Sequence, residues 1–132
     1  MTQQQTHETR LERVLGVPLS ETAVRQWPQS GEMVQVAKRI AEVESHFVGL
    51  RIGVGRRHRL GDVVVVEWST DYGDGRTFRN VSVAELEDGR AVRVTDYWGE
   101  PFVRPAWREG LTVPLDMPRG GPWPEADELL SD

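Results

Sequence analysis

The residue best placed for chemistry in this chain is a single carboxylate, Asp96, within an otherwise apolar strand pattern. Side chains along a strand point alternately to the two faces of a sheet, so Asp96 shares a face with Val92, Val94 and Trp98. A carboxylate on an apolar face is costly unless it is paired, hydrated or functional. We therefore expect a curved sheet with a pocket, in which Asp96 is the candidate acid or base.

Two Asp-Gly pairs, Asp74-Gly75 and Asp88-Gly89, separate three strand-like runs at residues 62–70, 76–87 and 90–98. Asp-Gly is a strong signal for a tight hairpin turn, with a positive φ at the glycine. The three runs therefore predict an antiparallel meander that brings Asp96 next to the two preceding strands.

Two-residue turns would fix the register of this meander. Val81 would then lie opposite both Trp68 and Asp96, and Arg79 would be the diagonal neighbour of Asp96, within reach of a long side chain. The opposite face would hold Glu67, Asn80, Ser82, Arg93, Thr95 and Tyr97. A first loop of three or five residues would invert the parity and turn Glu67 inward in place of Trp68, which makes Glu67 the alternative acid.

Each candidate residue has a structural interpretation as well as a functional one. Asp96 is either a catalytic or substrate-contacting acid, or a structural carboxylate paired with Arg79 or with backbone amides. Arg79 itself is better explained as structural than as a clamp for substrate. The candidate substrate-binding residues, which could equally belong to the core, are Trp27, Trp68, Trp98, Arg79, Val81 and Val94. The histidines and nearby acids show no metal-ligand spacing, so neither a metal nor a cofactor is expected.

The segments before the meander predict mainly helices. Helical spacing of apolar residues indicates a helix at 8–15, Ser20 can cap a short helix at 20–26, and a longer helix is expected at 33–47 after a turn-rich loop. A strand at 50–57 and a helical turn at 105–109 complete the pattern. This order predicts one α+β domain over residues 1–115, with residues 1–7 disordered and 116–132 an acidic, Pro/Gly-rich tail without regular structure.

The composition of the 132 residues excludes several classes of function. The net charge of −5 argues against a nucleic-acid partner, and the absence of cysteine excludes disulfides and thiol nucleophiles. No apolar run reaches the roughly 20 residues of a membrane span, and the N-terminus has no apolar segment for a signal peptide. A cytoplasmic protein with no membrane partner is therefore expected.

Several motifs together resemble the SnoaL-like branch of the nuclear transport factor 2 superfamily: WPQSGE at 27–32, GDVVVVEW at 61–68 and DGRAVRVTDYWGEPFVRPAW at 88–107. The resemblance implies a cone-shaped α+β barrel, in which a bent antiparallel sheet wraps around N-terminal helices and leaves an apolar cavity. It also implies that Asp96 falls at the pocket aspartate that polyketide cyclases and epoxide hydrolases of this superfamily use. The four valines at 63–66 replace the Arg and second Asp of the epoxide hydrolases, which argues against that reaction.

Two functional hypotheses follow from the resemblance. The first is a cofactor-independent cyclase, isomerase or dehydratase that moves a proton on a small polyketide-like or polycyclic carbonyl compound through Asp96. The second is a non-catalytic module of the same fold that binds a hydrophobic ligand or dimerises. A homodimer is expected in either case, with the sheet face bearing Ser82, Thr95 and Tyr97 buried between the subunits.

Overall fold

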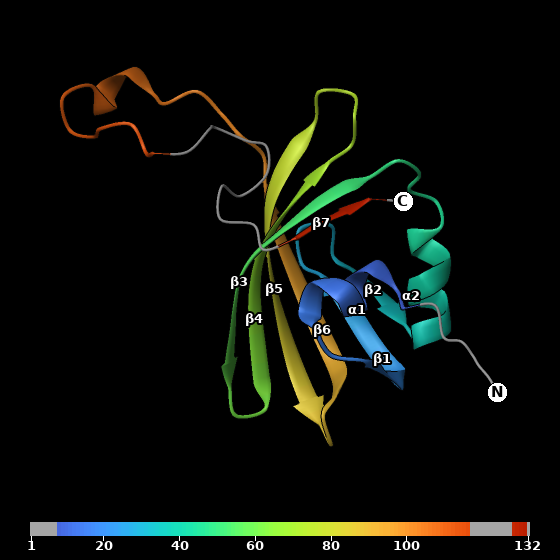
Figure 1. The fold of residues 1–132 in the computed structure, drawn as a ribbon. Helices are drawn as coiled ribbons and strands as arrows, with labels where there is room; N and C mark the ends of the chain where they lie inside the picture. Colours follow the sequence, from blue (N-terminus) through green and yellow to red (C-terminus); the bar gives the residue numbers. More distant parts are fainter. Residues whose placement is uncertain (1–7, 117–127, 132) are drawn as a thin grey trace.

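A seven-stranded sheet dominates the computed structural model, which describes residues 8–116 and 128–131 (Figure 1). The expectation of disorder at residues 1–7 therefore lies outside the described residues. The order of strands across the sheet is β2-β1-β6-β5-β4-β3-β7. In chain order the elements are α1 (Arg10–Leu15), β1 (Leu19–Trp27), β2 (Glu32–Gln35), α2 (Ala37–Glu44), β3 (Arg51–Leu60), β4 (Val63–Asp71), β5 (Thr77–Glu87), β6 (Arg90–Gly99), the 3₁₀-helix η1 (Ala106–Arg108) and β7 (Glu128–Ser131).

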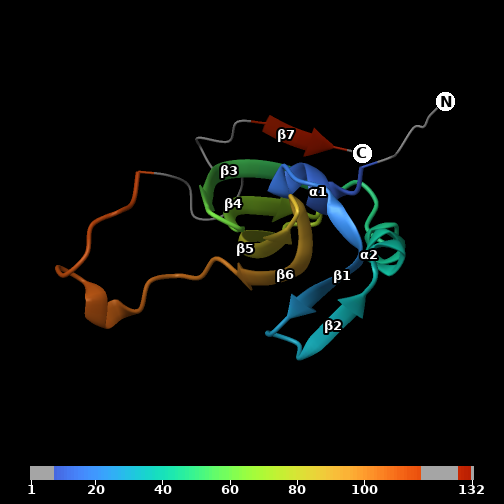
Figure 2. The same ribbon diagram turned by 90° about the horizontal axis from the view of Figure 1, so that it is seen from below.

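The sheet is bent, and both helices lie on its concave side (Figure 2). Strand β1 runs parallel to β6, and the other neighbouring strands are antiparallel. The core fills the concave side: Leu11, Val14 and Leu15 of α1 and Ile40 of α2 are buried against apolar residues of the strands. This arrangement confirms the expected α+β class.

Helix α1 has clear signals at both ends. Thr9 and Glu12 form a capping box, in which the Thr9 side chain accepts from the Glu12 amide and the Glu12 carboxylate accepts from the Thr9 amide. Gly16 ends the helix with φ 77°, a conformation that favours glycine. The helix predicted at 8–15 is therefore confirmed.

Both predicted turns are present, but they differ in length. Asp88 and Gly89, with φ of 52° and 77°, form a two-residue turn between β5 and β6. Gly75 also has a positive φ, yet Asp71 pairs with Thr77, so the first loop comprises five residues, 72–76.

A bulge at Val92 changes the register of the second hairpin. Leu86 lies opposite Ala91 near the turn, but Glu85 lies opposite Arg93, so Val92 is an extra residue on β6. Arg93 and Glu85, which lie opposite each other in the new register, share two hydrogen bonds of 2.6 and 2.7 Å on the exposed face. These bonds lower the pKa of Glu85 and raise that of Arg93.

The bulge and the longer loop correct the predicted faces of β5. Ser82 lies opposite Asp96 and Val66, and Asn80 lies opposite Trp68 and Trp98. Residues Asn80, Ser82, Ala84 and Leu86 consequently face inward and are buried, whereas Val81 and Val83 lie on the outer face. The predicted pairing of Asp96 with Val81 is wrong. The two shifts cancel between β4 and β6, so Trp68 and Asp96 still share the inner face.

The region before β3 contains more strand than the sequence predicted. Residues 20–26, expected to be helical, belong to β1, where Ala23 and Arg25 are buried with a period of two. The helix predicted at 33–47 is shortened to α2, because residues 33–35 pair with β1 as part of β2. Pairing with β6 and β2 outweighs the weak local preference of these segments for helix.

Residues 100–116 form an arm that extends away from the sheet (Figure 1). It contains η1, near the predicted helical turn at 105–109, and it exposes Phe102, Val103, Trp107, Leu111, Val113 and Leu115. Beyond it, β7 pairs with the edge of β3, although residues 116–132 were predicted to lack regular structure. Within the described residues, no helix is long and apolar enough to cross a membrane.

Candidate active site

A cavity of about 300 Å³ opens on the concave side of the sheet, between the helices and the inner faces of β1, β4, β5 and β6. Its aromatic walls come from both halves of the chain, and they are Trp27, Phe47, Trp68, Tyr72, Phe78 and Trp98. Tyr72 contacts Phe47 and Phe78 edge to face, with ring centroids 5.9 and 5.6 Å apart. The polar lining includes Arg10, Arg25, Glu44, Thr70, Asn80 and Asp96. The cavity therefore suits a small, mostly apolar molecule with a polar group.

Asp96 lies in the wall of this cavity, is 3% exposed and accepts hydrogen bonds from three side chains. Its Oδ2 accepts from Nε of Arg25 at 2.5 Å and from the indole N–H of Trp27 at 2.9 Å. Its Oδ1 accepts from the Ser82 hydroxyl at 2.6 Å. A buried carboxylate needs such partners, because an unpaired one would cost several kcal/mol.

The hydroxyl of Ser82 has a defined direction. Trp68 Nε1, 2.9 Å away, can only donate, so the Ser82 oxygen accepts from it and the Ser82 proton points to Asp96. Ser82 is fully buried. Trp68 of β4 and Ser82 of β5 therefore orient the carboxylate from one side, while Arg25 and Trp27 of β1 orient it from the other.

Arg25 connects Asp96 to a second carboxylate. Its Nη1 donates to Glu44 Oε2 at 3.3 Å, and the Arg25 and Glu44 side chains are only 10% and 13% exposed. Glu44 also accepts from the amides of Arg10 and Leu11, at 2.9 and 3.0 Å. These are the first two N–H groups of α1, which have no partner inside the helix. Glu44 therefore joins α2, α1 and the site.

The structure brings together only part of the predicted set. Asp96, Trp27, Trp68 and Trp98 line the cavity, whereas Val94 is buried in the core beside it. Val81 and Glu67 are on the outer face, where Glu67 pairs with Arg56 at 2.6 Å. Glu67 is therefore no alternative acid of this cavity.

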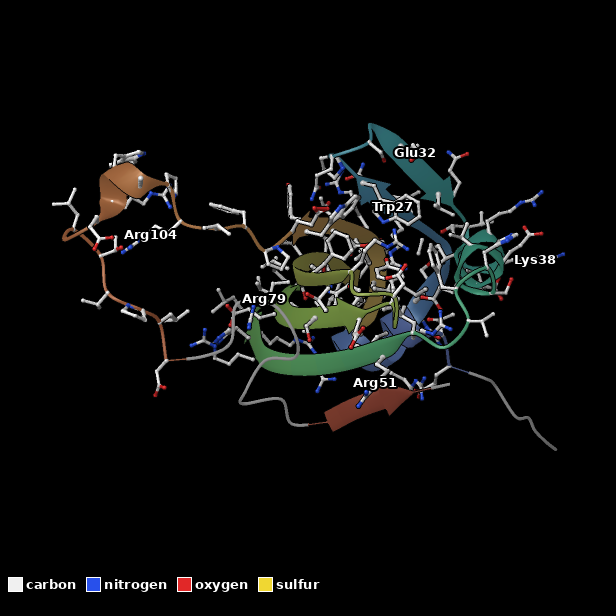
Figure 3. The ribbon with its side chains drawn as sticks, turned by 90° about the horizontal axis from the view of Figure 1, so that it is seen from above. Trp27, Glu32, Lys38, Arg51, Arg79 and Arg104 are labelled. Carbon is white, nitrogen blue, oxygen red and sulfur yellow. The ribbon has the colours of Figure 1, made fainter. Side chains whose placement is uncertain are left out.

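The sequence predicted Arg79 as the cationic neighbour of Asp96, and this prediction is wrong. The bulge at Val92 sets Ser82 opposite Asp96, so Arg79 lies on the other face of β5 and pairs across the sheet with Gly99 and Ser69. Figure 3 shows Arg79 well apart from Trp27, whose indole contacts Asp96. The cationic partner is Arg25.

Sequence reasoning missed Arg25 and Ser82. Residues 20–26 were interpreted as a helix, which gave Arg25 no relation to Asp96, and Ser82 was assigned to the outer face. The alternation Ala23, Arg25, Trp27 along a β-branched segment was the signal for an inward-facing Arg25. Among the described residues, no group of three His, Cys, Asp or Glu side chains could hold a metal ion.

Solved structures of other proteins share this architecture. An NTF-2 like protein of unknown function from Burkholderia xenovorans LB400 is 29% identical, with a TM-score of 0.65 over 74% of this chain and 77% of that chain. A putative ketosteroid isomerase from Kribbella flavida DSM 17836 is 28% identical, with a TM-score of 0.69 over 78% of each chain. TerC, co-crystallized with polyporic acid, is 20% identical, with a TM-score of 0.51 over 61% of this chain and 73% of that chain.

These likenesses show that the chain has the nuclear transport factor 2-like fold, which confirms the expected architecture. They support the superfamily named from the sequence, and neither a protein-family model nor a curated protein matches the chain. The SnoaL-like branch stays a prediction.

Proposed function

We propose that this protein is a cofactor-independent enzyme of the cyclase, isomerase or dehydratase type, of the SnoaL-like branch, with Asp96 as the group that accepts and returns a proton. The substrate is a small polycyclic or polyketide-like carbonyl compound enclosed by Trp27, Trp68 and Trp98. The observation that carries the proposal is Asp96 itself, a carboxylate held by three donors in the wall of an aromatic cavity.

The geometry supports proton transfer in two respects. Asp96 is oriented before any ligand arrives, and a catalytic group held in position reduces the entropy that the reaction must lose. Three donors occupy three of about four acceptor positions of a carboxylate, which leaves one position on Oδ1. A positioned general base contributes about 10²–10⁴-fold to rate. The 28% identity to a putative ketosteroid isomerase agrees with isomerase-type chemistry.

The test is Asp96→Asn, assayed with a panel of polycyclic ketones and polyketide-like enones by proton exchange and product formation. Turnover is expected to fall at least 10²-fold, because the amide cannot accept the proton. Asn80→Ala is the matched control, since Asn80 lines the same cavity without contacting Asp96. Equal turnover in Asp96→Asn and the unmodified protein would remove the catalytic role, provided circular dichroism shows both folded.

A second candidate function is ligand binding without chemistry. It is favoured by the two hydrogen bonds that Oδ2 accepts, from Arg25 and from Trp27, because they occupy both acceptor positions of this oxygen. A carboxylate with a structural role is held in the same way. Binding of the same compounds that survives Asp96→Asn, with no turnover in either protein, would support this alternative.

The expected homodimer is also a proposal, with a corrected surface. Ser82 cannot belong to the interface, because it is fully buried on the inner face. Thr95 and Tyr97 remain on the outer face, beside the half-buried Val81 and Val83. The apolar arm at 100–116 adds a second surface that a partner subunit would cover.

A further inference from the structure

The guanidinium of Arg25 has more donors than its two carboxylate partners use. Arginine carries five N–H groups, and here Nε donates to Asp96 and Nη1 to Glu44. Within residues 8–116 and 128–131, Nη2 donates to no protein group. The Arg25 side chain is nine-tenths buried and lines the cavity. Its Nη2 atom is not completely enclosed by the described residues. Nη2 is therefore a donor without a protein acceptor among these residues, and it belongs to a side chain that lines the cavity.

Most other donors of the inner wall already have acceptors in the protein. Trp27 Nε1 already donates to Asp96, and the Arg10 guanidinium donates to the carbonyl oxygens of Glu44 and Phe47. The Asn80 amide contacts the Thr70 hydroxyl at 3.4 Å and keeps a second N–H. Arg25 is thus the charged donor in direct contact with the candidate base, and Asn80 is its neutral competitor.

The charges of the inner wall indicate which ligand this donor receives. Arg10, Arg25, Glu44 and Asp96 sum to zero, and the exposed Glu32 adds one negative charge to the lining. A lining with no excess positive charge gives a permanently anionic ligand no net attraction. A neutral molecule with one strong acceptor, such as a ketone, gains the hydrogen bond without that disadvantage.

We propose that Arg25 binds the carbonyl oxygen of the substrate through Nη2 and stabilises the enolate that forms when Asp96 removes a neighbouring proton. This proposal rests on the proposed function. In the first step the C–H bond next to the carbonyl breaks, the proton joins Asp96, and the electron pair moves to the carbonyl oxygen. In the second step the enolate collapses and takes the proton from Asp96 at another carbon.

Arg25 suits this step because it contacts the group that loses negative charge. As the proton reaches Asp96, the carboxylate charge disappears and an equal charge develops on the substrate oxygen. The guanidinium keeps Glu44 as one anionic partner throughout, and its second anionic partner changes from Asp96 to the enolate oxygen, so no new charge is left unpaired in a buried site.

The experiment measures binding rather than turnover, with two probes of similar shape, 2-acetylnaphthalene and 2-isopropylnaphthalene. Quenching of the fluorescence of the cavity tryptophans gives each Kd. The unmodified protein is expected to bind the ketone about tenfold or more tightly than the hydrocarbon, as for a hydrogen bond from a charged donor. In Arg25→Lys this ratio should fall to about twofold, while Asn80→Ala should keep it.

A ratio that survives in Arg25→Lys, or one that disappears in Asn80→Ala, would overturn the assignment. If Arg25→Lys does not fold, the carbonyl stretch of ¹³C-labelled ketone bound to the unmodified protein decides. A shift to lower frequency than in hexane is expected, and an unshifted band would contradict the proposal. Because neither readout needs turnover, loss of the ketone preference is distinguishable from failure of Asp96 as a base.

Discussion

At the scale of single residues, the candidate site is defined by how its hydrogen bonds are shared. Asp96 accepts one hydrogen bond from each of three residues. The donors are chemically different: the guanidinium of Arg25, the indole of Trp27 and the hydroxyl of Ser82. Ser82 matters most among the neutral donors, because it both donates to Asp96 and accepts from Trp68. The orientation of a cavity tryptophan is thereby tied to the orientation of the carboxylate.

Ser82→Ala should destabilise the protein by about 1–3 kcal/mol, since it leaves Trp68 Nε1 and Asp96 Oδ1 each without a partner in a buried place. Urea unfolding followed by tryptophan fluorescence measures the change. Ser45→Ala is a suitable control, because the Ser45 hydroxyl donates to a carbonyl at the exposed end of α2. Equal midpoints for the two variants would show that the Ser82 bonds contribute nothing net.

At the scale of elements, Glu44 is the point where the two helices and the sheet meet. One carboxylate accepts from the first amides of α1, although it belongs to the last turn of α2, and it also holds Arg25 of β1. Helix α1 is only six residues long, so it depends on such tertiary contacts for its stability.

Glu44→Gln should therefore loosen α1 as well as the site. Replacing a carboxylate oxygen by an amide nitrogen opposes one donor with another, at a cost of about 1–3 kcal/mol. Hydrogen exchange of the Arg10 and Leu11 amides should become faster, and thermal unfolding should occur at lower temperature. Glu42→Gln, in the same helix, is the control: its pair with Arg39 is exposed and worth at most about 1 kcal/mol. Unchanged exchange at Leu11 would refute the role given to Glu44.

Some of the helices and strands could be predicted from the sequence and others could not. The meander was predictable because the Asp-Gly pairs mark its turns and the runs between them are rich in β-branched residues, which favour strands. The bulge was not predictable, because Val92 is an ordinary strand residue and nothing in the sequence marks it as an extra one. Strand β1 was missed because its partner strands, β6 and β2, lie far along the chain or within a segment interpreted as helix. Arg25 was lost with it.

At the scale of the whole molecule, the arm at 100–116 is the feature that a monomer does not explain. Six large apolar side chains on it are 67–86% exposed: Phe102, Val103, Trp107, Leu111, Val113 and Leu115. At roughly 150–250 Å² per aromatic side chain, Phe102 and Trp107 alone would bury about 300–500 Å² against a partner, a large part of the ~800 Å² per subunit in a stable interface. Figure 3 shows Arg104 of the arm far from the labelled residues of the body.

The double variant Phe102→Ser/Trp107→Ser should shift the protein from dimer to monomer, because it removes the two aromatic side chains of the arm. Multi-angle light scattering at micromolar concentration measures the mass. Val48→Ser is the control, as Val48 is 87% exposed but lies on the body of the protein. An unmodified protein that is already monomeric at this concentration would rule out the dimer itself.

The bulge at Val92 makes chain length, rather than residue identity, the determinant of the site. Strand β5 is held by β4, so adding one residue to β6 between Arg93 and Asp96, with the bulge retained, would set Asp96 opposite Val81 and turn its carboxylate to the outer face. Every residue that contacts Asp96 would still be encoded, yet the cavity would lose the Asp96 carboxylate. The insertion of a single codon in β6 would therefore remove this carboxylate from the cavity without changing any residue of the site.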